Sequence, residues 1–306
     1  MTKNRTHTYS WLRFCRLDGN LFENIPSNLP AHLKDLRLAA NLLQNITCDD
    51  IRSLALLTDL EILDLSGNNI AILLSGTFKA MSRLRYLDLS KNKLELLLPR
   101  TFYGLANLEV LLLNDNKALS SVSDGSFANL SNLKYLFLYG CSLAGIRSKA
   151  RSGRSKLNDY LPTLRYMWLF GNPLNCDCEL IPLLQFVNER HVRLDEGFHS
   201  ISLPDETLLH DAIEDALSRT RVKSDQSVCV SPHNRYKAVV GHAILDVSKE
   251  NLSCPDEPMY IVVSSFLGIA LFTIAVPIVY CLVGVYLFLI GIAKKHFGWK
   301  MDDDNN

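Results

Sequence analysis

Leucine follows one recurrent pattern between residues 33 and 174. Six segments match L-x-x-L-x-L-x-x-N-x-L, with occasional Met or Ile for Leu and one Cys for Asn, and they begin at Leu33, Leu60, Leu84, Leu108, Leu133 and Leu164. Apolar residues that alternate with other residues indicate a β-strand, because successive strand side chains point to opposite faces. The pattern therefore predicts one short strand in each of six copies.

Successive copies begin 27, 24, 24, 25 and 31 residues apart. A unit of this length cannot bury its own leucines, so neighbouring copies must stack around one continuous core. This is the pattern of a leucine-rich repeat, and we predict an α/β solenoid, a leucine-rich repeat horseshoe, over residues 33–174. We expect each Asn to bond backbone groups of its own and the adjacent copy, and Cys141 to take this structural place in the fifth copy. Recurrent phenylalanines late in three copies should pack under the convex side: Phe78, Phe102 and Phe127.

A run of 35 uncharged residues extends from Met259 to Ala293. About 20 apolar residues suffice to cross a bilayer, so we predict one transmembrane helix over 259–293. Acidic residues precede the run, and Lys294 and Lys295 follow it. The positive-inside rule then makes 294–306 a short cytosolic tail, too short for a signalling domain. These features predict a single-pass type I protein of the cell membrane, with its N-terminus extracellular or in the endosomal lumen.

Sequence features before the run also indicate the extracellular side. Four N-x-S/T triplets offer glycosylation acceptors at Asn4, Asn45, Asn129 and Asn251. The first residues, MTKNRTHTYSWLRF, lack the apolar stretch of a signal peptide. We therefore expect that an N-terminal segment is missing from this chain.

Cys176 and Cys178 lie one residue apart in PLNCDCEL. Side chains so placed on an extended stretch diverge, whereas a disulfide needs Cα atoms about 4.4–6.8 Å apart with facing Cβ vectors. Each thiol therefore needs a distant partner, and Cys229 and Cys254 are the later cysteines outside the apolar run. Half of a zinc site is the alternative, which the oxidising compartment and the lack of a second close pair disfavour.

Several motifs resemble the extracellular leucine-rich repeat family, and in particular the membrane-proximal ectodomain of a Toll-like receptor. They are GNPLNCDCEL, SVCVSP, LSCPDEP before the apolar run, and HFGWK after it. The resemblance covers Leu21 to about Cys254. It implies a cysteine-rich C-terminal cap over 175–258 with Cys176–Cys229 and Cys178–Cys254 disulfides. It also implies a partial N-terminal cap over 1–32 that ends in Cys15. We expect this chain to lack the cytosolic signalling domain of that family, because 13 residues follow the run.

Strand positions between the leucines should face the concave side. In the last two copies they are aromatic: Tyr135, Phe137, Tyr139, Tyr166, Trp168 and Phe170. Large exposed apolar patches usually mark interaction sites, so we predict that these six residues bind a ligand. In the alternative, they are core residues beneath a covering segment. That segment is either the basic 144–161 loop or the cap insertion LPDETLLHDAIEDALSR. The insertion reads as a short helix with Leu209, Ile213, Ala216 and Leu217 near one face.

The net charge and the spacing of the histidines exclude some classes of function. Formal net charge is zero, from 32 basic and 32 acidic residues, and the histidines show neither metal nor triad spacing. We predict no enzyme, no metal and no cofactor. The favoured function is receptor-like binding of a protein or other macromolecular ligand, and the family resemblance implies Toll-like innate immune recognition. A dimer with itself or with another leucine-rich repeat receptor is a further expected partnership. The alternative is a cell-adhesion or guidance molecule that binds a protein partner in trans.

Overall fold

The computed structural model describes residues 11–146, 157–175, 180–195, 209–214, 228 and 245. The chain divides into two compact units, Met1–Leu252 and Ser253–Asn306, and all described residues belong to the first. The four cap cysteines, the apolar run and the cytosolic tail lie outside the described residues, as does most of the basic loop.

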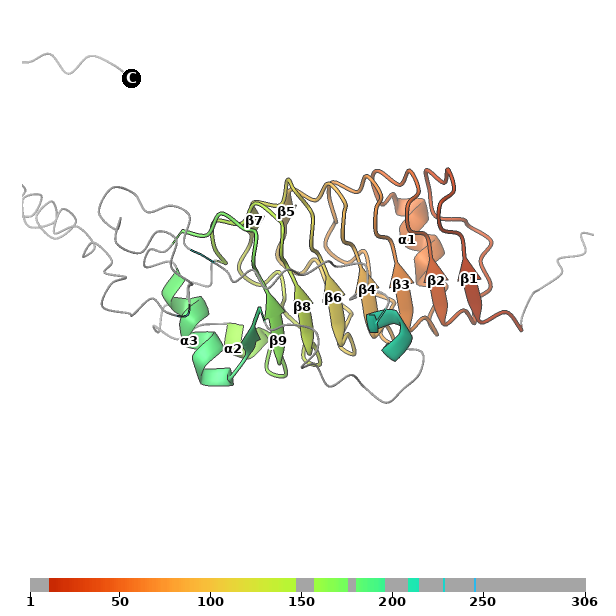
Figure 1. Ribbon diagram of the computed structural model, residues 1–306. Helices are drawn as coiled ribbons and strands as arrows, with labels where there is room; N and C mark the ends of the chain where they lie inside the picture. Colours follow the sequence, from red (N-terminus) through yellow and green to blue (C-terminus); the bar gives the residue numbers. More distant parts are fainter. Residues whose placement is uncertain are drawn as a thin grey trace, which may run out of the picture. The chain divides into compact units, whose positions relative to one another are not determined.

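One parallel sheet organises the first unit (Figure 1). Its strand order is β1-β2-β3-β4-β6-β8-β9-β10, so neighbours in the sheet are also neighbours in the repeat sequence. The strands are β1 (Phe14–Arg16), β2 (Asp35–Arg37), β3 (Ile62–Asp64), β4 (Tyr86–Asp88), β6 (Val110–Leu112), β8 (Tyr135–Phe137), β9 (Tyr166–Trp168) and β10 (Arg193–Leu194). The six strands predicted from the leucine pattern are confirmed as β2 to β9 of this sheet.

The leucines of all copies form one hydrophobic core. The middle residue of each repeat strand points into it, as Leu63 and Leu87 do, and these two are direct partners in the sheet register. The three recurrent phenylalanines are also buried there. Phe102 stacks on Phe78 and on Phe127, with ring centroids 6.5 and 6.2 Å apart. The prediction that these residues pack inside the array is confirmed.

The connecting segments differ between copies. A two-stranded sheet joins β5 (Leu96–Leu97) to β7 (Ser121–Val122) in parallel. The longer first copy contains α1 (Cys48–Ala55), whose N-cap Thr47 forms a capping box with Asp50. After β8 come α2 (Leu157–Tyr160) and, beyond β9, α3 (Ile181–Arg190). Apolar side chains of α3 join the core, and β10 pairs with β9, so residues 180–195 cover the end of the array as a solenoid requires.

The repeat asparagines form a ladder of hydrogen bonds. The Asn68 amide donates to the carbonyl oxygen of Leu65 in its own copy at 3.0 Å and to that of Leu38 in the preceding copy at 2.9 Å. Its Oδ1 accepts from the Leu43 N–H at 3.1 Å. Corresponding bonds are made by the other repeat asparagines, Asn41, Asn92, Asn116 and Asn172. The structure confirms the predicted role of this position.

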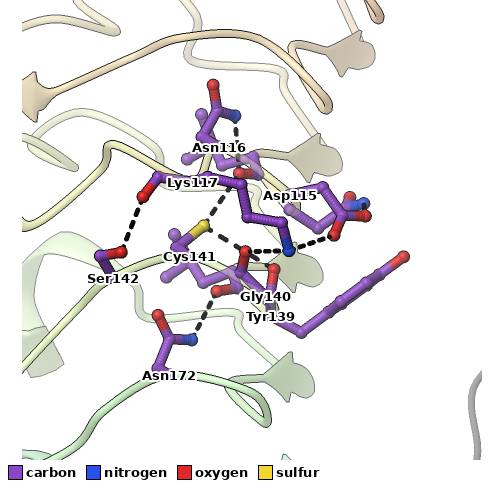
Figure 2. A network of polar contacts seen from close by, with 11 residues as sticks. Asp115, Asn116, Lys117, Tyr139, Gly140, Cys141, Ser142 and Asn172 are labelled. Atoms are coloured by element: carbon purple, nitrogen blue, oxygen red, sulfur yellow. Dashed lines mark hydrogen bonds and ion pairs between the residues drawn. The ribbon is translucent and has the colours of Figure 1, made fainter.

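Cys141 replaces Asn in this ladder, and its surroundings compensate (Figure 2). Its Sγ lies 3.3 Å from the Leu113 carbonyl oxygen, where the Asn amide would donate. The thiol offers only a weak acceptor for an N–H of the preceding copy. That copy has one extra residue before Leu119, and the Leu119 N–H instead bonds the Asn116 carbonyl oxygen at 3.0 Å. The one-residue insertion thus removes the donor that the thiol cannot satisfy.

Strand β1 has the geometry of a repeat strand. It pairs in parallel with β2, and Cys15 lies opposite Leu36. The Asn41 amide donates to the Leu17 carbonyl oxygen at 3.0 Å, as it would to a preceding copy. The sequence from Leu12 to Phe22 has the repeat spacing, but Cys and Phe replace two of its leucines. Residues 11–22, assigned from the sequence to a partial N-terminal cap, therefore stack in repeat register.

The stacked phenylalanines should contribute much of the core's stability. We expect Phe102→Ala to lower the free energy of unfolding by about 3–5 kcal/mol, because it leaves a cavity between two rings. Urea denaturation followed by circular dichroism measures this loss. Tyr103 is 39% exposed beside it, and Tyr103→Ala should change stability by less than about 0.5 kcal/mol. Equal effects of the two variants would contradict the inferred role of the ring stack.

The three described cysteines should react in a fixed order. Cys48 is exposed, Cys15 is half-buried and Cys141 is buried. Burial raises the pKa of the Cys141 thiol to about 12, and burial, followed by the Asp35 carboxylate, raises that of Cys15. The thiolate is the nucleophile, so at pH 8 only about one Cys141 thiol in 10,000 is reactive. We expect iodoacetamide to label Cys48 first, Cys15 more slowly and Cys141 only after unfolding, as measured by peptide mass spectrometry. Fast labelling of native Cys141 would contradict this order.

Candidate functional site: the concave face of the repeat sheet

The second face of the sheet carries the first and third residues of each strand, which the sequence analysis placed on the concave side. We call it the concave face. Its character changes along the array: carboxylates occur on β2, β3 and β4, aliphatic residues on β6, and aromatic residues on β8 and β9. Because all copies share one register, each position forms a column across the sheet.

The six predicted aromatic residues come together as three stacked pairs. Ring centroids are 5.3 Å apart in Tyr135–Tyr166, 4.2 Å in Phe137–Trp168 and 4.6 Å in Tyr139–Phe170, and each pair is within 10° of parallel. The parallel register places the first two pairs directly opposite each other on β8 and β9. Such pairs contribute about 0.5–1.5 kcal/mol beyond the burial of their area. The result is a rigid aromatic surface two strands wide.

The expected exposure of this surface is wrong. Trp168 is 0% exposed and Phe137 is 1% exposed, and only Phe170 of the six is half-buried. The buried cluster to which the rings belong extends along the concave face to Ile62 and Tyr86 and also includes Leu209, Ala212 and Ile213. In Figure 1 residues 209–214 overlap β3 and β4 rather than β8 and β9. The structure thus agrees with the alternative in which these rings are core residues rather than an exposed patch. Their role in ligand binding stays a prediction.

Residues 209–214, which we call the strap, are helical and amphipathic. The buried residues Leu209, Ala212 and Ile213 stand at positions i, i+3 and i+4, which share one face of a helix. On the other side, His210 Nε2 lies 3.6 Å from Glu214 Oε2. The sequence analysis placed Leu209 and Ile213 near one face of this helix, but it did not name Ala212.

The concave face of β2, β3 and β4 also carries buried polar residues. Asp35 accepts from the Arg37 guanidinium at 3.2 Å. The Asp64 and Asp88 carboxylates accept from the backbone N–H two residues later, at 2.9 and 2.8 Å. Burial raises the pKa of Asp35, although the charge of Arg37 opposes the shift. These contacts hold the carboxylates in fixed positions, and sequence reasoning did not single them out.

A ladder of charges follows the residues that precede the strands. Lys34 Nζ lies 2.6 Å from the Glu61 carboxylate. Further along, Glu109 receives Arg85 on one oxygen and Lys134 on the other, both at 2.6 Å. A hollow beside it is lined by Glu61, Arg83, Arg85, Asn107, Glu109, Asn132 and Lys134. Because opposite charges alternate from copy to copy, the ladder stabilises their stacking.

The other predicted sites are only partly within the described residues. Asn45 and Asn129 are exposed and accessible to glycosylation, whereas Asn4 and Asn251 lie outside the described part. So do Cys176, Cys178, Cys229 and Cys254, and their two disulfides stay predictions. Within the described ranges, no group of His, Cys, Asp and Glu side chains could hold a metal ion. No helix there is long and apolar enough to cross a membrane, and the run 259–293 lies outside that search.

Comparison with known proteins supports the repeat. Residues 58–118 match the family model described as leucine rich repeat. Nephrocan from Mus musculus is 30% identical over 162 residues, which are 53% of this chain and 29% of that protein. This chain therefore spans less than a third of the length of that relative. Together with the parallel sheet, these matches support the leucine-rich repeat class, a fold that generally binds proteins. Likeness to a Toll-like receptor is not among them, and nothing in them points to catalysis.

Glu109 gives the ladder a measurable pH dependence. Burial alone would raise its pKa, but hydrogen bonds from Lys134 and Arg85 outweigh burial and lower the pKa. A carboxyl with a lowered folded-state pKa stabilises the fold above its unfolded pKa of about 4.3, and this contribution is lost as pH falls through the folded pKa. We expect Glu109→Gln to lower the urea midpoint at pH 7, and the difference from wild type to shrink below about pH 4.3.

The matched control is Glu95→Gln, because Glu95 is exposed and no ion pair joins it to a described residue. Its urea midpoint should follow that of wild type at every pH. A deficit of Glu109→Gln that is constant down to pH 3 would show that the effect comes from packing rather than from charge.

Proposed function

We propose that this chain is the ligand-recognising part of a receptor-like protein that binds a protein partner through the concave face. The observation that carries the proposal is the aromatic surface of three stacked pairs on two adjacent strands. Aromatic residues dominate the binding energy of protein interfaces. A surface fixed by the repeat register loses little conformational entropy on binding. Since five of the six side chains are buried, recognition requires them to become exposed.

The finer proposal is a single-pass type I protein of the cell membrane with a Toll-like role in innate immune recognition. It is supported by the cysteine motifs, by the 35-residue apolar run and by the basic residues that follow it. The exposed acceptors Asn45 and Asn129 agree with an extracellular location. The second candidate, an adhesion molecule that binds in trans, rests on the same surface and differs in its partner.

Variants on two surfaces test the proposed binding face. The full chain in lipid nanodiscs is screened against an array of extracellular proteins. Any partner found is then measured by surface plasmon resonance with Tyr139→Ala/Phe170→Ala. We expect at least a tenfold loss of affinity, since each hot-spot aromatic contributes about 2 kcal/mol or more.

The matched control is Ile72→Ala/Leu74→Ala, which removes exposed apolar residues from another part of the array. This variant should bind like wild type. Loss of binding in the control variant, with full binding by Tyr139→Ala/Phe170→Ala, would place the interface elsewhere and refute the proposal. Circular dichroism must show that both variants remain folded.

A further inference from the structure

We infer that a glycan attached to Asn45 lies over exposed aliphatic side chains of the next two copies and covers them. These side chains are Ile72, Leu74 and Leu96, which we call the aliphatic patch. The inference rests on the extracellular location in the proposed function, because N-linked glycans occur on secreted chains. Three observations carry it: the place of Asn45 in the array, the direction of the side chains, and the exposure of the patch.

Asn45 lies beside the patch, in the same row of the array. The Ala71 N–H donates to the Gln44 carbonyl oxygen at 3.3 Å, so the residues that follow these two, Ile72 and Asn45, are neighbours on adjacent copies. The residue before Leu96 donates in turn to the Ala71 carbonyl oxygen, also at 3.3 Å, and this brings Leu96 next to Ile72. Neighbouring extended segments lie about 4.7–4.9 Å apart, so Leu96 is roughly 10 Å from Asn45.

The side chains of this row point away from the core. In each copy the residue after the row position is buried in the core: Ile46, Leu73 and Leu97. Successive side chains of an extended segment point to opposite sides. Asn45, Ile72 and Leu96 therefore share the outer side, and all three are exposed. A sugar attached to Asn45 emerges on the side where the aliphatic side chains meet water.

The aliphatic patch is confined to two copies. Ile72, Leu74 and Leu96 are 46%, 50% and 37% exposed. Along the row, polar residues stand on both sides of the patch. Asn45 precedes Ile72, and Ser121 lies opposite Leu96 in the register of β5 and β7. Contiguous exposed apolar side chains usually mark a surface that makes contacts, and the acceptor at Asn45 adjoins this surface directly.

A glycan fits the patch by its chemistry. Sugar rings carry C–H groups on their faces and hydroxyl groups on their rims. A ring can therefore contact aliphatic side chains and keep its hydroxyl groups in water, which is how an attached glycan makes a surface more soluble. The first two sugars of an N-linked glycan are long enough to extend from Asn45 over Ile72 to Leu96.

Carbene footprinting tests this contact. The full chain is expressed in mammalian cells behind a cleavable signal peptide, purified in nanodiscs and labelled with a photoactivated diazirine, which inserts into exposed C–H bonds. Peptide mass spectrometry gives the occupancy of Asn45 and the labelling of single residues. We expect Asn45→Gln to increase the labelling of Ile72 and Leu96 several-fold, because it removes their cover. Asn45 is replaced rather than Thr47, since Thr47 is also the N-cap of α1.

Two controls show whether the effect is local. Labelling of Phe14, which is exposed on the concave face, should be the same in wild type and Asn45→Gln. The matched variant is Asn129→Gln, which removes a second exposed acceptor. The counterpart of Asn129 in the preceding copy is Gly104 rather than an aliphatic residue. Asn129→Gln should therefore leave the labelling of Ile72 and Leu96 unchanged.

Two results would overturn the inference. One is an unmodified Asn45 in the chain that carries the signal peptide, and the other is a modified Asn45 with equal labelling of the patch in wild type and Asn45→Gln. If Asn45→Gln does not fold, the glycan is removed enzymatically from the folded protein, and unchanged labelling then refutes the contact.

The signal peptide ensures entry into the secretory pathway, so failure of the contact is not confused with failure of the proposed location. Neither result affects the test of the concave face, which depends on Tyr139 and Phe170.

Discussion

The side-chain amide of the repeat asparagine is the contact on which the sheet depends. Its N–H group donates to carbonyl oxygens of its own copy and of the preceding copy, and its oxygen accepts a backbone N–H from the preceding copy. Asn68 makes all three of these bonds. These backbone groups lie in the turns after each strand and are largely buried, where an unpaired polar group is costly. The ladder therefore fixes both the distance between copies and their register.

Because the register is fixed, residues at equivalent positions of successive copies lie beside one another across the sheet. A charge placed before one strand meets the charge before the next, which is how Glu109 comes to lie between Arg85 and Lys134. An aromatic residue on β8 lies directly opposite one on β9, so that rings stack instead of scattering. The asparagine hydrogen bonds in the turns therefore also determine how the side chains line up on the concave face.

Much of this order could be predicted from the sequence, because it repeats. The strands, the stacked phenylalanines and the asparagine ladder each follow from a period of about 24 residues. Strand β1 was missed as a repeat strand because Cys15 and Phe22 stand where leucines are expected. The burial of Trp168 was predicted only as an alternative. Local periodicity describes the repeat strands and says nothing of which later segments pack against their concave face.

The extra residue before Leu119 has a consequence for how such arrays vary in length. The insertion is absorbed within a single turn, where the Leu119 N–H bonds the Asn116 carbonyl oxygen, and the strands on either side keep their alignment. The cysteine at position 141 belongs to the following copy, yet it suits only a predecessor with this longer turn. Copies four and five are therefore a matched pair. In a recombined or designed array these two copies would have to be moved together. Neighbouring copies that both have Asn at the repeat position can be exchanged one at a time.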